Sequence, residues 1–254
     1  MGKIIAIANQ KGGVGKTTTA VNLSSCVAAL GKKVLVVDID PQGNTTSGLG
    51  VDSKKLKNTV YDVLVNDVEP KDAVSDIPYF KMKILGSDIS LAGAEIELVG
   101  VEKREFLLKN ALEKVRDDFD FIFIDSPPSL GLITLNGLVA ADTVLVPVQC
   151  EYYALEGIAQ LNNTVNMVKK ALNPKLDFEG VVMTMFDGRT NLSIQVVEEV
   201  KKHFGKKVYR SLIPRNVRLS EAPSFGEPIL IFDRSAAGAV AYTNLAKEFI
   251  EKNK

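Results

Sequence analysis

The chain has 254 residues, of which 46% are hydrophobic and 24% charged, a composition that excludes wholesale disorder. Its 31 Lys and Arg residues balance 31 Asp and Glu residues, which excludes a protein coated in positive charge but not a local basic face. Cys26 and Cys150 are too few for a disulfide framework and lack metal-ligand spacing, so we expect both in the core. The single histidine, His203, follows two lysines and is expected at the surface.

Neither end of the chain resembles a targeting or membrane segment. The first ten residues, MGKIIAIANQ, contain an apolar run too short for a signal peptide or a spanning helix. The last nine, AKEFIEKNK, are polar and lack the basic amphipathic extension that anchors proteins on lipid surfaces. We therefore expect a cytoplasmic protein with no stable membrane anchor.

Short Val- and Ile-rich runs alternate with amphipathic stretches along the chain. Continuous apolar runs of this length predict strands buried on both faces, as in a parallel sheet covered by helices. The predicted strands are residues 4–8, 34–37, 82–85, 121–124, 144–148 and 181–185. The predicted helices are residues 17–30, 101–116, 155–172, 191–204 and 236–250.

This alternation predicts the α/β fold class, with a doubly wound, mostly parallel sheet flanked by helices. Residues 43–81 carry weaker strand signals, and short helices are expected there, for example over residues 59–65. We see no internal repeat, low-complexity run or Pro/Gly-rich linker in the sequence. The economical prediction is therefore a single domain over residues 1–254.

A glycine-rich segment, KGGVGKTTT over residues 11–19, joins the first predicted strand to the first predicted helix. In such a turn, backbone N–H groups converge on phosphates, and the helix N-terminus adds the positive end of its dipole. Gly12, Gly13 and Gly15 let the backbone approach the phosphates, and Val14 belongs to the same cradle. The segment therefore predicts a nucleotide site at this point of the sheet.

The residues after the glycines have the chemistry of a P-loop. Lys16 is placed to reach the β- and γ-phosphates of ATP. The hydroxyl of Thr17 is placed to bind Mg²⁺, and Thr18 to hold the α-phosphate.

The loop departs from the usual pattern G-x-x-x-x-G-K-[ST]. Gln10 occupies the first glycine position, and a second lysine, Lys11, follows it. Two ammonium groups directed at one triphosphate would be crowded. We expect Lys11 to point outward, toward phosphates held by a second subunit, so that dimerisation completes the charge neutralisation needed for phosphoryl transfer.

Three carboxylates lie at the ends of two predicted strands. Asp38 and Asp40 are two residues apart, so both are expected on one side at the carboxyl end of their strand. Asp40 lies nearer the loop and is predicted to orient an attacking water, although a role for the pair in capping a helix or turn stays open. Asp125 ends another buried strand and is expected to hold Mg²⁺ through water.

At these residues the chain closely resembles the ParA/Soj family of chromosome- and plasmid-partitioning ATPases, in the deviant Walker-A (MinD/ParA) superfamily. The matching segments are residues 11–19, 38–50, 92–98, 124–131, 147–157, 185–192 and 213–226. DPQGN, EYYALEG and IPRNVRLSEAPS are far more specific than the phosphate loop alone. No extra DNA-binding domain precedes the loop, which favours the chromosomal Soj type.

The resemblance implies a homodimer that sandwiches ATP and Mg²⁺. In such a dimer, Lys11 reaches across the interface, Gly12 lies close to it, and Asp40 activates hydrolysis. Pro214 and Asn216 lie near the adenine. The dimer is expected to bind double-stranded DNA of the nucleoid without sequence preference, and a ParB/Spo0J-type centromere-binding protein is expected to trigger hydrolysis and release.

Residues 189–218 carry eight basic and two acidic residues, a net charge of +6 that the rest of the chain cancels. Such a run is often only a solvated helix face, but it is also what a phosphate-binding face would look like. The resemblance assigns DNA binding to Arg189 and Arg218. Without base-reading motifs or interleaved aromatic residues, binding is expected to be backbone-directed and salt-dependent.

Three other functions remain as alternatives. A MinD-like membrane-surface ATPase that places the division site would need a C-terminal amphipathic helix. An iron–sulfur reductase or carrier would need paired cysteines at a dimer axis. A metabolic kinase would need an acceptor pocket, and none is evident in the sequence.

Overall fold

Seven strands form one sheet in the computed structural model of the chain, which describes residues 1–152 and 154–254. Tyr153, within the segment 147–157, lies outside the described residues. The sheet order is β3-β4-β2-β5-β1-β6-β7, and all neighbouring pairs are parallel except β3 and β4. The strands are β1 (Lys3–Ile7), β2 (Val34–Asp38), β3 (Val74–Asp76), β4 (Met82–Leu85), β5 (Phe121–Asp125), β6 (Thr143–Gln149) and β7 (Asp177–Thr184).

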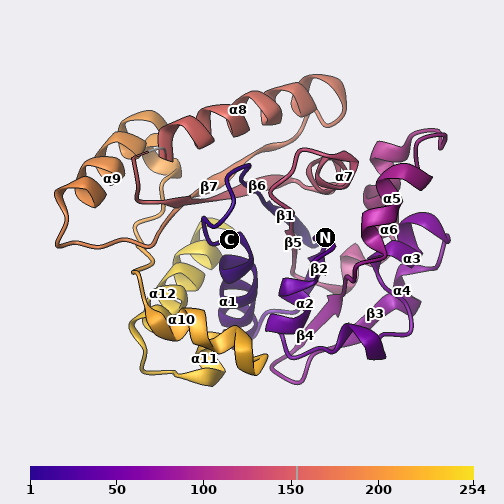
Figure 1. Cartoon of the computed structure of the whole chain (residues 1–254), viewed down its shortest axis with the longest axis horizontal. Coiled ribbons are helices and arrows are strands. Elements are labelled where there is room, and N and C mark those ends of the chain that lie inside the picture. Colours follow the sequence, from indigo (N-terminus) through magenta and orange to yellow (C-terminus); the bar gives the residue numbers. More distant parts are fainter. Residues whose placement is uncertain (153) are drawn as a thin grey trace.

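Helices cover both faces of the sheet (Figure 1), so the predicted α/β class is confirmed. One core contains side chains of α1, α10, α11 and α12, and the other contains side chains of α3 and α5 to α9. The α-helices are α1 (Lys16–Ala29), α2 (Asn44–Gly48), α3 (Val60–Val65), α4 (Pro70–Ala73), α5 (Leu91–Glu97), α6 (Leu107–Glu113), α7 (Leu132–Ala140), α8 (Ala154–Ala171), α9 (Asn191–Phe204), α10 (Val217–Glu221), α11 (Ile229–Phe232) and α12 (Ala237–Lys252). Short 3-10 helices are η1 (Ser53–Lys55), η2 (Arg104–Phe106), η3 (Arg116–Asp118), η4 (Gly205–Lys207) and η5 (Ala222–Phe225).

All six predicted strands are present, with small differences at their ends. The largest difference is in β7, which begins at Asp177 rather than at residue 181. Strand β3 was not predicted, because three half-exposed residues at the sheet edge show no usable periodicity. The helix expected over residues 59–65 is confirmed as α3, whereas α5 and α7 were not predicted.

The predicted helix over residues 101–116 is wrong, because the chain breaks there into η2, α6 and η3. A continuous helix would pair the N–H of Leu108 with the carbonyl of Arg104. The amide of Asn136, from α7, lies between these two groups instead. It accepts from the Leu108 N–H at 3.1 Å and donates to the Arg104 carbonyl at 2.9 Å. A side chain distant in sequence thus interrupts the ladder.

The register of the sheet aligns the ends of three strands. Asp125 at the end of β5 is paired in register with Ile7 of β1 and with Asp38 of β2. The sheet order also places β2 and β6 on opposite sides of β1, the arrangement that opens a crevice at the carboxyl ends of parallel strands. The loop after β1 and the predicted carboxylates therefore meet at the carboxyl ends of the strands.

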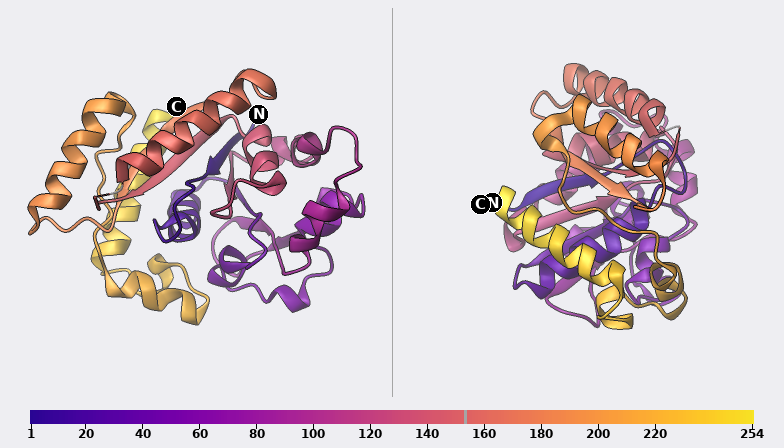
Figure 2. Two further views of the ribbon diagram at one scale, coloured as in Figure 1. Left: turned by 45° about the horizontal axis from the view of Figure 1, so that its top comes forward. Right: turned by 90° about the vertical axis from the view of Figure 1, so that its left-hand side faces the viewer.

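The chain termini lie at the opposite end of the strands, on the same side of the molecule, as the right view of Figure 2 shows. Lys3 in β1 donates to Glu179 of β7 and to Asn253, each at 2.5 Å. Asn253 also donates to Glu179 at 2.7 Å. These contacts hold the C-terminal end of α12 against the first residues of β1 and β7.

The expectations for cysteine and histidine are confirmed. Cys26 and Cys150 are buried in the two separate cores, and burial raises their thiol pKa to about 11 and about 12. His203 is exposed on α9. Among the described residues, we find no helix with the length and apolar character needed to cross a membrane.

Asn173 provides a test of how α7 is held. Its buried amide donates to the carbonyls of Leu138, Val139 and Ala141 at 2.8 to 3.2 Å, where α7 ends. We expect Asn173→Ala to lower the free energy of unfolding by about 1–3 kcal/mol, because buried carbonyls lose their donor. Urea unfolding measures this change. Asn244→Ala, on the exposed face of α12, is the matched control and should change stability by less than about 0.5 kcal/mol; equal losses would contradict the assignment.

Candidate functional site

The loop between β1 and α1 forms an open backbone cradle. Gly13 and Gly15 have left-handed conformations, with φ of +74° and +86°, and Gly15 is the N-cap of α1. A Cβ atom added to Gly12 or Gly13 would meet no atom within 4 Å, so a ligand can approach this backbone closely. The geometry is that of an anion-binding turn at a helix N-terminus.

Two polar residues that sequence reasoning missed hold this cradle in place. Asn9 accepts the N–H of Lys11 at 3.0 Å and donates to the carbonyl of Pro147 in β6 at 2.8 Å. Thr184, at the end of β7, donates to the carbonyl of Val14 at 2.8 Å. Thr184 is the last residue of β7 and Asn9 follows β1 by two residues, so a polar residue at the end of a buried strand is the signal in the sequence that could have revealed them.

Lys16 lies inside the loop with 7% of its surface exposed. Its ammonium donates to the Lys11 carbonyl at 3.3 Å. Burial lowers the pKa of Lys16, while the nearby Asp125 and Asp40 favour its charged form. The site thus holds a positive charge that is poorly hydrated and available to an anion.

Asp125 joins α1, α2 and β5 through one oxygen atom. The hydroxyls of Thr17 and Thr45 donate to its Oδ2 at 2.8 and 2.7 Å. Its other oxygen, Oδ1, is buried and has no hydrogen-bond partner among the described residues. A hydroxyl beside a carboxylate with an unused oxygen suits Mg²⁺, which prefers oxygen ligands and keeps several waters. Thr45 was not identified from the sequence.

Asp38 shapes the loop that follows β2. It is fully buried, and its Oδ2 accepts both the N–H and the hydroxyl of Thr46 at 2.8 Å. Its Oδ1 accepts the N–H of Asp40 at 3.1 Å. These bonds match the capping role that the sequence left open for Asp38, and they leave Asp40 as the aspartate that lines the cavity.

The cavity over the cradle has a volume of about 600 Å³. Asp40 lines it together with Gly12, Lys16 and Thr18. The Oδ1 of Asp40 accepts one bond, from the N–H of Gln42 at 3.0 Å. The carboxylate of Asp40 can therefore accept a further hydrogen bond from a group inside the cavity.

A second cavity of about 450 Å³ adjoins the first and shares Gly15, Thr18 and Met185 with it. Met185 follows β7 with a φ of +51°, a conformation that is strained for a side chain of this size. Pro214 and Asn216 line this second cavity. The Oδ1 of Asn216 is buried and has no partner in the part of the chain that the structure describes, so it can accept a bond from a ligand.

Lys11 lies against Glu151 of the same chain, with Nζ at 3.9 Å from the carboxylate. Arg215 approaches the other oxygen of Glu151 at 3.6 Å. The Lys11 side chain is one-third exposed. Its predicted reach toward a second subunit stays a prediction.

The basic residues of segment 189–218 are less isolated in space than in sequence. Arg189 is 89% exposed and pairs with Asp187 at 2.7 Å, and Arg218 pairs with Glu221 at 2.9 Å. Further pairs are Lys202–Glu199, Lys207–Asp177, Arg210–Glu248 and Arg215–Glu151. Except for Glu199, which belongs to the segment itself, these acidic partners lie outside residues 189–218 and offset much of its net charge.

The buried carboxylates predict how stability depends on pH without nucleotide or magnesium. Burial raises the pKa of Asp38 to about 6 and of Asp125 to about 7, above the unfolded value of about 3.9. The folded chain therefore binds more protons between these values, and its free energy of unfolding should fall as pH rises from about 4 to 7.

Urea unfolding across this pH range measures the effect. Asp125→Asn removes one titrating group and should flatten the decline. Asp117→Asn, at a largely exposed carboxylate, should leave the decline unchanged. Parallel curves for the wild type and Asp125→Asn would contradict the assignment.

Comparison with known proteins finds a matching family and relatives that align over nearly the whole chain. Residues 2–178 match the family described as AAA domain. The sporulation initiation inhibitor protein Soj of Bacillus subtilis (strain 168) is 59% identical over 248 residues, covering 98% of each chain. The chromosome-partitioning ATPase Soj of Treponema pallidum (strain Nichols) is 49% identical over 253 residues, covering 100% of this chain and 99% of that protein.

A similar solved structure is that of cobyrinic acid a,c-diamide synthase from Mycobacterium smegmatis with bound ATP analog and magnesium. It is 40% identical, with a TM-score of 0.84, and the match covers 97% of this chain and 93% of that one. The family match covers more than half of the chain, and the relatives named Soj match nearly all of it. The chain belongs to the Soj/ParA family of chromosome-partitioning ATPases.

Proposed function

We propose that residues 1–254 act as one P-loop ATPase domain that uses ATP and Mg²⁺ to partition chromosomal DNA. The observation that carries this proposal is a pair of adjoining cavities, one over the carboxyl ends of β1, β2 and β5 and the other beside the carboxyl end of β7. One cavity contains the phosphate cradle and Asp40, and the other contains Pro214 and Asn216. Similar proteins are named for chromosome partitioning, and a similar structure holds an ATP analog with magnesium.

The cradle would hold the phosphates of ATP. The backbone from Gly12 through Val14 to Gly15 surrounds them, Lys16 neutralises the β- and γ-phosphates, and Thr18 contacts the α-phosphate. The buried, poorly hydrated ammonium of Lys16 supports this role, because a phosphate replaces contacts that water does not supply.

Thr17 and Asp125 would hold Mg²⁺, the threonine directly and the aspartate through water. The bound ion would neutralise charge on the phosphates. The unpartnered Oδ1 of Asp125 supports this assignment, since a metal-bound water would be its missing donor. Among the described residues, no cluster of three acidic, cysteine or histidine ligands could hold a metal alone, and Mg²⁺ sites in nucleotide enzymes are often completed by substrate phosphates.

At the other end of the site, Asn216 and Pro214 would receive the adenine. The unpartnered Oδ1 of Asn216 can accept a bond from the exocyclic amino group. Pro214 is fixed by the neighbouring backbone, because the N–H of Phe186 binds the Ile213 carbonyl at 2.9 Å and the N–H of Arg215 binds the Phe186 carbonyl at 3.1 Å. This wall is therefore preformed.

Hydrolysis would require Asp40 to orient the attacking water, and Lys11 to leave Glu151 and contact the phosphates of a second copy. The exposed cradle around Gly12 would then lie close to the dimer interface. The 3.9 Å separation between Lys11 and Glu151 supports this exchange, because a partly exposed ion pair of that length contributes little energy.

The ATP-bound homodimer would bind double-stranded DNA through Arg189 and Arg218, without sequence preference. Both arginines have carboxylate partners at the surface, and such pairs are weak enough to be exchanged for DNA phosphates. Two copies would double the number of phosphate contacts and so couple ATP to DNA affinity. A ParB/Spo0J-type protein would stimulate hydrolysis and release the dimer from the nucleoid.

The deciding experiment measures retention on duplex DNA with ATP, ADP or no nucleotide, each with and without the N-terminal peptide of a centromere-binding partner. The proposal expects retention with ATP, and its loss after the peptide is added. Equal retention in all nucleotide states would overturn the proposed switch. A parallel arm with anionic vesicles tests the MinD-like alternative, which predicts ATP-dependent binding to lipid instead.

Asp40→Ala is expected to bind ATP and form dimers while ATP hydrolysis falls by about 10²-fold or more, because the water loses its orienting carboxylate. Phosphate release and size-exclusion chromatography measure the two effects. Lys16→Ala is the contrasting variant and should lose ATP binding itself, as seen by calorimetry. Normal hydrolysis by Asp40→Ala would remove this residue from the mechanism.

Arg218→Glu is expected to weaken DNA retention at low salt while ATP-dependent dimerisation persists. Each lost phosphate contact should reduce the slope of log affinity against log salt by about 0.9. Lys57→Glu makes the same charge change at an exposed residue outside segment 189–218 and serves as the control. If both variants retain DNA equally, Arg218 does not belong to the DNA-binding face.

A further inference from the structure

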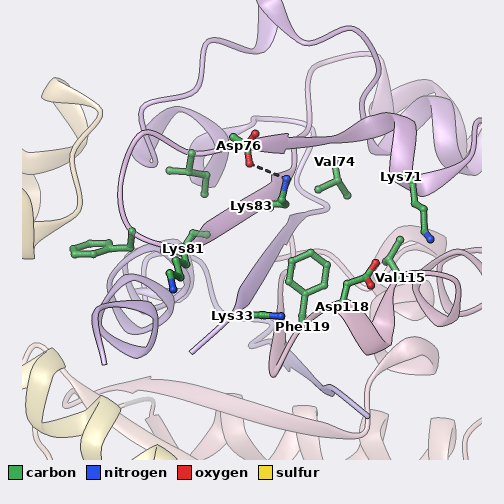
Figure 3. A pocket seen from close by; sticks show the side chains of 12 residues that line it. Lys33, Lys71, Val74, Asp76, Lys81, Lys83, Val115, Asp118 and Phe119 are labelled. Carbon is green, nitrogen blue, oxygen red and sulfur yellow. Dashed lines mark ion pairs between the residues drawn. The ribbon is translucent and has the colours of Figure 1, made fainter. Parts of the chain in front are cut away.

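A separate pocket, whose lining side chains are drawn in Figure 3, has a volume of about 610 Å³. This pocket lies at the opposite end of the strands from the phosphate cradle. It is formed where β2, β4 and β5 begin, between the β3–β4 edge and the segment around η3. The lining residues are Lys33, Lys71, Val74, Asp76, Ile77, Phe80, Lys81, Met82, Lys83, Val115, Asp118 and Phe119. None of them lines the two cavities of the nucleotide site.

The inner wall of this pocket is apolar. Met82 and Val115 are 2% and 3% exposed, so they belong to the core. Figure 3 shows the ring of Phe119 between the side chains of Val74 and Lys33. A pocket of this volume, with a preformed apolar wall, is within the range that holds small organic ligands.

The rim of the pocket is cationic. Within residues 1–152 and 154–254, Lys33, Lys71 and Lys81 have no carboxylate within ion-pair distance, whereas Lys83 pairs with Asp76 at 2.8 Å. Four lysines and two aspartates give the lining a net charge of +2 in a protein whose total charge is zero. This combination favours a ligand with an anionic group.

The backbone at the pocket is strained at one aromatic residue. Phe80 has a φ of +58°, a conformation that bulky side chains rarely adopt, and 39% of its surface is exposed. Such strain persists only where surrounding structure maintains it, and it is common at ligand sites. Here the strained turn places an aromatic residue next to Lys81 in the pocket lining.

We propose that this pocket binds a small amphipathic anion, namely an aromatic body that carries a phosphate or sulfonate group. The aromatic body would lie against Phe119 and Met82, and the anionic group would meet the ammonium group of Lys33. Lys71 and Lys81 lie at opposite ends of the pocket, on either side of Lys33, and would add longer-range attraction for the anion. Strand β2 separates this pocket from the nucleotide site, and its five residues span about 16 Å. The two sites can therefore be occupied together.

The methionines allow each site to be observed separately by ¹³C-methyl NMR. Met82 lines the proposed pocket, Met185 lines the nucleotide site, and Met167 is 63% exposed on α8. The protein is first saturated with ADP and Mg²⁺, and 2-naphthyl phosphate is then added as the probe. Met82→Leu assigns the resonance.

The proposal expects a saturable shift of Met82 alone, while Met185 and Met167 remain unmoved. The neutral probe 2-naphthol should bind at least about tenfold more weakly, equivalent to about 1.4 kcal/mol. Equal affinity for the two probes would mean that the anionic group contributes nothing to binding, and it would overturn the proposal. An unmoved Met82 would overturn it as well.

A double variant, Lys71→Gln with Lys81→Gln, tests the cationic rim. It should weaken binding of 2-naphthyl phosphate by about fivefold, the loss expected for two exposed charge contacts. The matched control, Lys54→Gln with Lys57→Gln, changes two exposed lysines outside the lining. An unchanged Met185 shift with ADP and Mg²⁺ verifies that both variants are folded. Equal affinity in the two double variants would overturn the assignment.

Discussion

The structure depends on one buried carboxylate, Asp125, at the point where three parallel strands end. Its Oδ2 accepts from the hydroxyls of Thr17 in α1 and Thr45 in α2, while Oδ1 has no partner within residues 1–152 and 154–254. Burial raises the pKa of this carboxyl to about 7, so the folded chain sustains an unfavourable charge here. A buried carboxylate that lowers stability in this way is expected where a cation, such as a metal bound to phosphates, will neutralise its negative charge.

Two aspartates near Asp125, Asp38 and Asp40, differ in what their carboxylates contact. Asp38, in register with it, directs both oxygens to the backbone and side chain of the following loop. Asp40 lines the cavity and accepts a single bond from Gln42. The two aspartates are two residues apart, yet one organises the loop and the other faces the place where a substrate would lie.

The basic segment 189–218 also differs between the sequence and the folded surface. Residues 189–218 carry a net charge of +6, but carboxylates such as Asp187, Asp177 and Glu248 neutralise much of it. A basic face built from such pairs would bind DNA only when several contacts act together. This property suits the proposed coupling of DNA affinity to dimerisation.

The sequence by itself determined the parallel α/β architecture and the phosphate loop, because buried strands and glycine-rich turns are recorded in local patterns. Tertiary structure alone decided that Asn136 breaks the expected helix over residues 101–116, and that Asn9 and Thr184 anchor the loop. It also decided the pairing of Lys11 with Glu151, 140 residues apart in sequence. Each of these contacts joins residues distant in sequence, and local periodicity contains no record of which distant groups will meet.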